Sequence, residues 1–446
     1  MKKYFFALIS FFTLFVYTAH SQGCLPDGIY FKTQSQIDSF AINYPDCSVI
    51  QGDVIICQET AISNLNGLNS ITAIDGYLGI YSNSFVSLNG LNNLIRVGGH
   101  LSLSNNSNLT DISALNNLDT IGGNFLFKNN HLITTIDGFY DLMYIGGDFD
   151  IHWNNHLNSI TGFELTNLDS INNLFIYENP YLTTCTSPAI CSLLADPFCP
   201  VNIYANNSGC NNPAEAAQGC GVPVVCLPMG SQYFLNQTEI DNFPVLYSGC
   251  TSLNGNTFIG GNNVNNLNGL NQITSIAGNL QLSLGPNNTS PVLTDLQGLN
   301  NVDTISGNFS VLNLGHLTSL SGLDSLEYIG GNLNLNSISN LASLSALHKL
   351  KSVRDVEIIL NRKLVSLSGL DSLNRIRGSL RIINNELLND LSALSNIDSI
   401  EYTLEIEGLS SPENLEDFYN LKYVGIGISI HHNPFLTSLK GLDNIA

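Results

Sequence analysis

The feature that most constrains the fold is a repeat of about 24 residues. Equivalent apolar residues lie 24 residues apart at Leu88, Ile112, Ile136 and Ile160. Each unit follows approximately L-x-x-L-x-x-L-x-x-I-G-G-N-L-x-L-x-x-N, with Ile, Val or Phe replacing some leucines. One unit has too few apolar residues to form a core alone, whereas stacked units can bury a continuous one. The repeat therefore predicts a solenoid.

The second half of each unit alternates with period two, as in Phe125/Phe127 and Leu380/Ile382. This alternation is typical of a short strand with one buried face. An α-helix of ordinary length does not fit into the rest of the unit. We therefore expect an all-β solenoid, a right-handed parallel β-helix with two or three short strands per turn. The alternative is a leucine-rich-repeat horseshoe, which shares the L-x-L-x-x-N pattern.

Glycines and asparagines flank these strands. Glycine pairs such as Gly98-Gly99 precede the strands, and we expect them to supply backbone freedom at a bend. An Asn follows many strands, and its side chain is expected to bond the backbone of the neighbouring turn and form a ladder. These residues are Asn83, Asn106, Asn130, Asn154, Asn179, Asn361, Asn385 and Asn433.

A longer repetition divides the chain into two similar parts. The same C-L-P opening begins at Cys24 and again at Cys226. This predicts two tandem domains, residues 22–212 and 226–446, joined by a linker at 213–225 that contains Pro and Gly. The second domain stops in mid-repeat, so we expect it to be truncated and to lack a C-terminal cap.

Short helices are expected at the domain ends. Each opening segment predicts a short amphipathic helix, with Thr33 as N-cap in the first domain and Thr238 in the second. Residues 185–210 depart from the repeat. They are expected to form a disulfide-bound end cap around a short helix at 189–195, which would close the strand edge.

Ten cysteines fit an oxidising compartment, and the C-x-x-C and C-x-x-H spacings of zinc or redox sites do not occur in the sequence. Spacing alone does not fix connectivity, although matching contexts pair Cys24 with Cys47 and Cys226 with Cys250. No state is assigned to Cys57 or Cys199. The disulfide candidates are Cys24, Cys47, Cys185, Cys191, Cys210, Cys220, Cys226 and Cys250.

The N-terminus predicts export. A short basic start and an apolar run at 4–18 predict a signal peptide at residues 1–21. The run is too short to span a bilayer, and no later segment of the sequence is apolar for long enough. We expect a secreted or cell-surface protein. Its net charge of −21 argues against a nucleic-acid partner.

The cysteine opening, the repeated strands with their glycine pairs and the Asn179-Pro180 ending resemble the receptor L domain. This is the ligand-binding β-helix of insulin- and epidermal-growth-factor-type receptors. Tandem L-like domains of exported bacterial surface proteins are similar as well. The resemblance implies ligand binding through exposed faces of the solenoid. It assigns no binding residue, because those contacts are not part of the repeat.

Outward residues of successive strands should form columns on the sheet face. Aromatic residues beside a cation and a His on such a face predict a recognition patch for peptide or glycan. The alternative is that these side chains only shield the sheet or pack against the end cap. The candidate residues are Lys128, His152, Trp153, Phe175 and Tyr177.

Two other clusters predict no chemistry. The column Glu357, Arg381 and Glu405 predicts a charge ladder, because the arginine would keep both carboxylates ionised and unsuited to acid–base catalysis. His431 and His432 should point to opposite faces of a strand, so neither catalytic nor metal residues are expected. Sequence motifs for phosphate binding, zinc hydrolysis or serine hydrolysis do not occur.

We therefore expect a binding or adhesion module that is not an enzyme and needs no cofactor. Its partner would be an extracellular protein or glycan. The alternatives are a polysaccharide-active β-helix enzyme, a lyase or hydrolase, and a structural spacer for a further domain.

Overall fold

The predicted signal peptide at residues 1–21 and Cys226 lie outside the residues that the structure describes. The computed structural model describes residues 23–57, 62–163, 171–196, 199–222, 230–285, 288–410 and 413–446.

A long parallel sheet runs through each half of the chain, with neighbouring strands one turn apart. The eight strands of the first are β2 (Ile29–Phe31), β4 (Val54–Cys57), β6 (Leu78–Tyr81), β8 (Leu101–Ser104), β10 (Phe125–Lys128), β12 (Phe149–His152), β13 (Leu174–Tyr177) and β14 (Val201–Tyr204). The nine strands of the second are β15 (Gln232–Phe234), β17 (Thr257–Ile259), β19 (Leu280–Leu282), β21 (Phe309–Leu312), β23 (Leu333–Asn336), β24 (Val356–Ile359), β26 (Leu380–Ile383), β28 (Thr403–Glu407) and β30 (Gly427–His431).

Short strands form the neighbouring side of each coil. In the first half they are β1 (Gly23–Cys24), β3 (Val49–Ile50), β5 (Ala73–Ile74), β7 (Arg96–Val97), β9 (Thr120–Ile121) and β11 (Tyr144–Ile145). In the second half they are β16 (Ser252–Leu253), β18 (Ser275–Ile276), β20 (Thr304–Ile305), β22 (Tyr328–Ile329), β25 (Arg375–Ile376), β27 (Ser399–Ile400) and β29 (Tyr423–Val424). Isolated parallel bridges such as Ser87 to Asp111 mark a further side.

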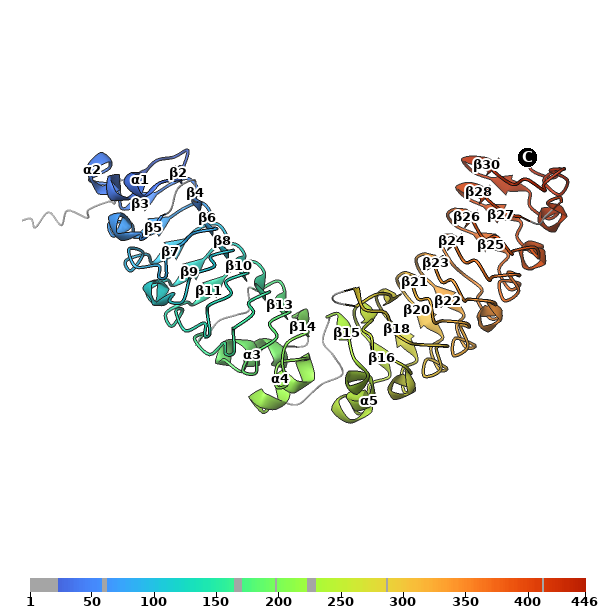
Figure 1. Ribbon diagram of the computed structural model, residues 1–446, viewed down its shortest axis with the longest axis horizontal. Coiled ribbons are helices and arrows are strands. Elements are labelled where there is room, and N and C mark those ends of the chain that lie inside the picture. Colours follow the sequence, from blue (N-terminus) through green and yellow to red (C-terminus); the bar gives the residue numbers. More distant parts are fainter. Residues whose placement is uncertain are drawn as a thin grey trace, which may run out of the picture.

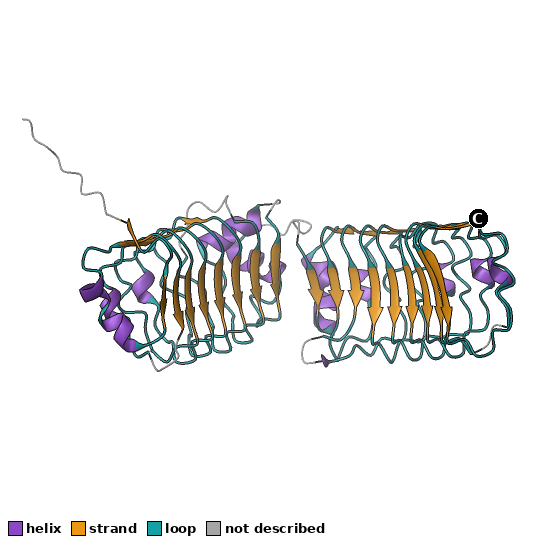
Figure 2. Ribbon diagram, turned by 90° about the horizontal axis from the view of Figure 1, so that it is seen from above, coloured by secondary structure: helices purple, strands orange, loops and turns teal. Residues whose placement is uncertain are grey.

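The expected β-rich solenoid with parallel sheets is confirmed. Both long sheets lie on the inner side of an arc (Figure 1), and their strands run side by side when seen from above (Figure 2). Inward residues such as Phe125 and Phe127 are fully buried, as the period-two alternation predicts. The division into two domains and the right-handed coil remain predictions.

Glycine pairs serve a purpose other than the one expected. The φ angles of Gly98 and Gly122 lie outside the left-handed region, so these positions do not require glycine for backbone freedom. A Cβ on Gly122 would instead lie 2.0 Å from the carbonyl oxygen of Gly98 one turn earlier. Close stacking of turns therefore requires glycine there. Conformational freedom matters at other corners, such as Gly90 with its φ of 115°.

The predicted asparagine ladder is present. Asn130 is fully buried, and its Nδ2 donates to the Leu103 carbonyl oxygen at 2.9 Å. Its Oδ1 accepts from the backbone N–H of Asn106 at 3.1 Å. The next asparagine repeats the pattern, because Asn154 Oδ1 accepts from the Asn130 N–H at 3.0 Å. The ladder thus satisfies buried backbone groups that the corners of the turns leave unpaired.

The described helices are short and lie near the ends of the stacks. They are α1 (Gln34–Asp38), α2 (Phe40–Asn43), α3 (Pro188–Ala195), α4 (Pro213–Cys220) and α5 (Gln237–Leu246). Single turns of 3₁₀-helix occupy corners at η1 (Asn66–Leu68), η2 (Ser113–Leu115), η3 (Asn268–Leu270), η5 (Ser345–Leu347), η6 (Ser392–Leu394) and η7 (Glu416–Phe418).

The N-cap prediction is confirmed for one helix and wrong for the other. Thr33 caps α1 within a capping box completed by Gln36. Asn236, rather than Thr238, caps α5 and accepts from the Glu239 N–H at 3.1 Å. Asn236 is favoured because Glu239 then occupies the third helical position, where its carboxylate accepts from the N–H of Leu235.

The segment after β13 differs from the predicted cap and linker. Residues 201–204 form β14, which adds a strand to the long sheet, and Asn206 continues the ladder by donating to the Ile176 carbonyl oxygen at 2.8 Å. Residues 213–220, assigned above to the linker 213–225, form α4. Proline at a first helical position has no N–H to leave unpaired, so Pro213 starts this helix rather than breaking the chain.

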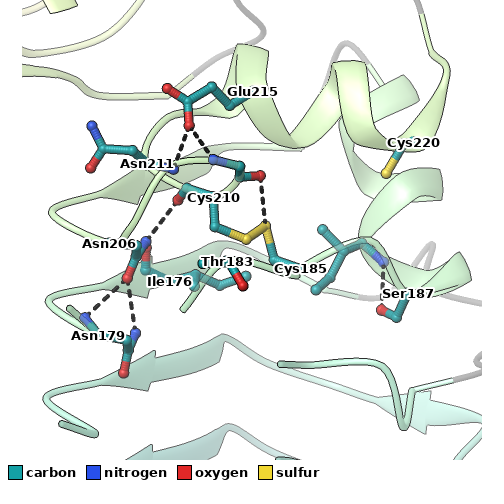
Figure 3. The surroundings of a disulfide bond; sticks show 12 residues. Ile176, Asn179, Thr183, Cys185, Ser187, Asn206, Cys210, Asn211, Glu215 and Cys220 are labelled. Carbon is teal, nitrogen blue, oxygen red and sulfur yellow. Dashed lines mark hydrogen bonds between the residues drawn. A yellow bond between two sulfur atoms is a disulfide. The ribbon is translucent and has the colours of Figure 1, made fainter. Parts of the chain in front are cut away.

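Disulfides tie this region together. Cys185 pairs with Cys210 and Cys191 with Cys220, while Cys24 pairs with Cys47 near the N-terminal helices. Figure 3 shows the Cys185–Cys210 bond beside Asn206 and Glu215. Cys250 is also disulfide-bonded. Cys57 and Cys199 are free thiols, and burial raises the pKa of Cys199 to about 11, which keeps it protonated and unreactive.

Candidate ligand-binding surface

We call the solvent-facing side of each long sheet its outer face. The five predicted patch residues lie together on the outer face of the first long sheet. Lys128, His152 and Tyr177 occupy the same column of β10, β12 and β13, in direct register. Phe175 lies two residues before Tyr177 and so faces the same side of β13. Trp153 follows β12 directly. The register of β10, β12 and β13 therefore agrees with the register expected from the repeat.

Trp153 is the most exposed member of the group, with 42% of its surface accessible. Its φ of 58° is left-handed, as is that of the residue after several other long strands. Those strands place Ser82, Asn105 and Asn129 there, but also Glu178 and Leu360. A left-handed conformation costs a bulky residue about 1–2 kcal/mol. Trp153 is the largest side chain at this position, and its exposure makes it available for contact with a ligand.

His152 differs from the prediction, because it is only 5% exposed. Its Nδ1 lies 2.7 Å from Asp150 Oδ1, and its ring stacks on Tyr177 with centroids 4.5 Å apart. The Trp153 ring stands edge-on to it at 4.8 Å. His152 therefore packs against the rings of Tyr177 and Trp153 and has little exposed area for contact with a ligand.

The aromatic stack continues beyond the predicted residues. Tyr204 of β14 stacks on Tyr177 at 5.0 Å and on Tyr233 of β15 at 3.6 Å. Phe258 of β17 follows at 6.0 Å. The stack thus crosses from the first long sheet to the second. We call Trp153, Phe175, Tyr177, Tyr204 and Tyr233 the aromatic strip.

The sequence analysis does not identify Tyr204, because it predicts a cap at residues 185–210, nor Tyr233, which lies in the opening segment of the predicted second domain. A signal was present: V-x-I-Y-x-N at 201–206 repeats L-x-I-Y-x-N at 174–179. Asn206 occupies the ladder position of that second copy. The same six-residue pattern could therefore have placed Tyr204 directly beside Tyr177.

Direct contacts join the two halves beneath the strip. The Ser231 N–H donates to Asn202 Oδ1 at 3.1 Å, and the Ala214 N–H of α4 donates at 3.1 Å to the hydroxyl of Tyr247, the residue that follows α5. A Cβ on Gly230 would lie 2.3 Å from the Val201 carbonyl oxygen. The strip therefore rests on a packed junction.

Tyr177 and Tyr204 stay neutral at physiological pH. Burial raises the pKa of Tyr177, and the nearby carboxylates of Asp150 and Glu178 raise it further. Burial likewise raises the pKa of Tyr204, with Tyr233 and Tyr177 contributing. Each phenol therefore remains a hydrogen-bond donor. The strip combines apolar ring edges with neutral hydroxyl groups.

Polar groups border the strip. The Trp153 Nε1–H donates to the Glu178 carboxylate, and half-buried Lys128 lies one strand away from His152. A shallow hollow on the same face extends toward the N-terminus and is lined by Tyr77, Tyr81, His100, Leu101, Ser102, Asn124, Phe125, Leu126, Asp148 and Asp150.

The second long sheet carries different chemistry on its outer face. Arg381 Nε lies 2.7 Å from Glu405 Oε2, and its Nη1 lies 3.0 Å from Glu357 Oε1. The predicted charge ladder is confirmed. Arg381 pairs with both glutamates, so the charged groups of this column are already engaged with one another.

The fold defines a class of protein: a disulfide-bonded solenoid of parallel β-strands with one aromatic outer face. Residues 46–100 match the family model of the receptor L domain, and the resemblance predicted from the sequence is confirmed over this segment. The comparison with curated proteins gives no match. The matched family indicates a ligand-binding module of receptor type, and together with three disulfides it indicates an extracellular protein.

None of the helices in the described ranges is both long and apolar enough to cross a membrane. The aromatic strip lies outside the residues that match the family model.

Proposed function

We propose that the protein is a non-catalytic, secreted or cell-surface receptor module that binds a protein ligand through the aromatic strip. The observation that carries this proposal is the continuous stack from His152 through Tyr177 and Tyr204 to Tyr233 on one sheet face. Aromatic residues dominate the energetics of protein interfaces, because they bury a large area with few rotatable bonds.

The ring geometry favours a protein over a glycan. Sugars are bound by stacking on the exposed faces of aromatic rings. The rings of His152, Tyr177, Tyr204 and Tyr233 lie face to face in sequence, with interplanar angles of 10°, 11° and 19°. Those faces are therefore covered by each other, and ring edges and hydroxyl groups point outward. Edges and hydroxyls fit the mixed apolar and polar surface of a protein.

Preorganisation strengthens the proposal. Side chains held between two neighbours lose little freedom on binding, so less binding free energy is spent on ordering them. The Asp150–His152 contact and the Trp153–Glu178 hydrogen bond hold the N-terminal end of the strip in the same way. Lys128 and Glu178 would form the polar rim that surrounds an apolar interface centre.

The test uses substitutions that the fold already accepts elsewhere. Trp153→Ser introduces the residue found at the equivalent left-handed position 82, and Phe175→Asn introduces the residue of the neighbouring rung, Asn202. The double variant should fold normally. The matched control is Asn334→Ser on the outer face of the second long sheet, beside Ser310.

Wild type and both variants would be tested against arrays of purified extracellular proteins and of glycans. We expect a protein ligand whose Kd rises at least about 10-fold in the double variant, which corresponds to 1.4 kcal/mol, and is unchanged in the control. Equal affinity in all three would place the ligand on another face. Binding of glycans alone would contradict the choice of a protein ligand.

A further inference from the structure

We propose that Glu407, His431 and His432 form a binding site for a divalent transition-metal ion of the zinc class. The site lies at the ends of β28 and β30, far along the second long sheet from the aromatic strip. It does not depend on the function proposed above.

The structure overturns the expectation that the two histidines point apart. Glu407 and His431 are register partners on neighbouring strands, so their side chains share one column. His432 follows the strand with a left-handed φ of 56°, which turns its side chain back toward the same column. The alternation of β30 ends one residue earlier, at His431.

Three potential ligand atoms converge there. His431 Nδ1 and His432 Nδ1 are 3.1 Å apart, and they lie 3.7 and 3.3 Å from Glu407 Oε1. In a tetrahedral zinc site with bonds of about 2.0–2.2 Å, neighbouring ligand atoms are roughly 3.3 Å apart. The three atoms therefore already approximate one face of a coordination tetrahedron.

The donor set suits this class of metal. Imidazole nitrogens and a carboxylate oxygen bind Zn²⁺ and its neighbours in preference to Ca²⁺ or Mg²⁺, which favour oxygen ligands alone. A hydrogen bond between the two Nδ1 atoms can use only one of their lone pairs, whereas a metal ion uses both. A bound metal ion therefore pairs both Nδ1 atoms more completely than the hydrogen bond between them does.

The backbone beneath the site is fixed. Asn433 Nδ2 donates to the His431 carbonyl oxygen at 3.0 Å and to the Ile406 carbonyl oxygen at 2.9 Å. This asparagine belongs to the ladder, so the ladder holds the turn that carries His432. Support of this kind orients metal ligands before the ion arrives.

The site is also accessible. The side chains of His431 and His432 are 42% and 79% exposed, and that of Glu407 is 24% exposed. A hollow beside the two histidines, lined by residues that include Thr437 and Ser438, leaves room for a fourth ligand such as water. The net charge of −21 favours the approach of cations.

The experiment is calorimetric titration of the purified full chain with ZnCl₂, beside variants that keep the fold. His432→Asn places in the left-handed position a residue that Asn105 and Asn129 already show to be compatible. Glu407→Gln removes the carboxylate at constant size. His348→Ala removes an exposed histidine elsewhere and serves as the matched control. Circular dichroism verifies that each variant is folded.

We expect wild type and the control to bind one Zn²⁺ that both site variants bind at least about 10-fold more weakly, because losing a ligand costs no less than losing a supporting residue. CoCl₂ provides a second readout, as its visible absorption reports nitrogen ligation and should weaken in His432→Asn. Equal zinc affinity in wild type, His432→Asn and Glu407→Gln would overturn the proposal, and so would a wild type that binds no zinc.

Discussion

The two halves of the chain stack similar turns but hold them together by different means. In the first half, buried asparagines follow one another from Asn83 to Asn179, half-buried Asn206 continues them, and aromatic rings stack on the solvent-facing side. In the second half, apolar residues occupy some of the same corners. Ile338 is one of them, and its N–H still donates to Asn361 Oδ1. Outside, Arg381 joins two glutamates.

The difference shows what a parallel stack demands of its outer face. Because the strands are in register, each outward residue lies directly beside its counterpart in the next turn. The side chains of one column must therefore be able to pack against one another. Alternating charges achieve this by neutralising one another. Neutral rings achieve it by stacking, and they leave apolar edges exposed. Only the column of stacked rings leaves a surface suited to binding a partner.

The largest expected effect concerns the buried asparagine ladder of the first half. Asn130→Leu keeps the size of the side chain but leaves the Asn106 N–H without a partner and removes one hydrogen bond of the Leu103 carbonyl. At about 1–3 kcal/mol for the unpaired N–H and about 0.5–1.5 kcal/mol for the lost hydrogen bond, the free energy of unfolding should fall by about 1.5–4.5 kcal/mol. Urea unfolding followed by the fluorescence of Trp153, the only Trp in the chain, measures the loss.

The matched substitution in the second half is Ile338→Leu. It changes only the shape of an apolar residue and should cost less than about 1.5 kcal/mol. Urea unfolding followed by circular dichroism measures it. Equal losses in the two variants would mean that the asparagines contribute no more than apolar packing does.

A smaller effect is expected at the centre of the outer stack. Tyr204→Ala removes two stacked pairs, each worth about 0.5–1.5 kcal/mol beyond the area buried. The loss of stacking alone should lower the free energy of unfolding by about 1–3 kcal/mol, in addition to the cost of the buried area that is lost. Tyr204→Phe keeps both rings stacked and should be nearly neutral. If the two variants were equally unstable, the hydroxyl rather than the ring would hold the stack.

The charge ladder should contribute less. Arg381→Met removes both ion pairs, but the arginine side chain is 38% exposed, so the loss should be about 1 kcal/mol and should shrink in high salt. Arg375→Met, which removes the more exposed pair with Glu401, serves as control and should cost less. A salt-independent loss at Arg381 would indicate packing rather than charge.

The smallest effect concerns pH. Since the pKa values of Tyr177 and Tyr204 are raised in the folded protein, the unfolded chain loses its phenolic protons first, from about pH 10. The contribution of these two phenols to the free energy of unfolding should therefore be constant below that pH and fall above it. Urea unfolding between pH 8 and about 11.5 measures the slope.

The matched variant for pH is Tyr177→Phe/Tyr204→Phe, which should have a shallower slope because two of the groups responsible are gone. An unchanged slope would show that these phenols do not titrate differently in the folded and unfolded states.

Much of this architecture follows from the repeat alone. The alternation at Phe125 and Phe127 places inward and outward faces correctly, and the ladder follows from one Asn per turn. The charge column at Arg381 follows from the same register. Periodicity suffices for these features because each turn reproduces the geometry of the previous one.

The errors occur where the period is interrupted. Pro213 was assigned to a linker although proline also starts helices, and the disulfide-rich segment obscured the strand that carries Tyr204. The metal site depends on one left-handed residue, His432, whose φ no alternation pattern shows. The recurrence of Asn, Ser or Gly after other strands is the only signal of that conformation in the sequence.

The central claim is that a ligand contacts the outer face at the aromatic strip. Hydrogen–deuterium exchange of the protein with and without its ligand tests this claim most directly, because it locates the contact without substitutions. We expect slower exchange on binding in residues 149–154, 174–179 and 201–204 and unchanged exchange in residues 356–383. Protection confined to the second long sheet, or to the short strands, would contradict the account.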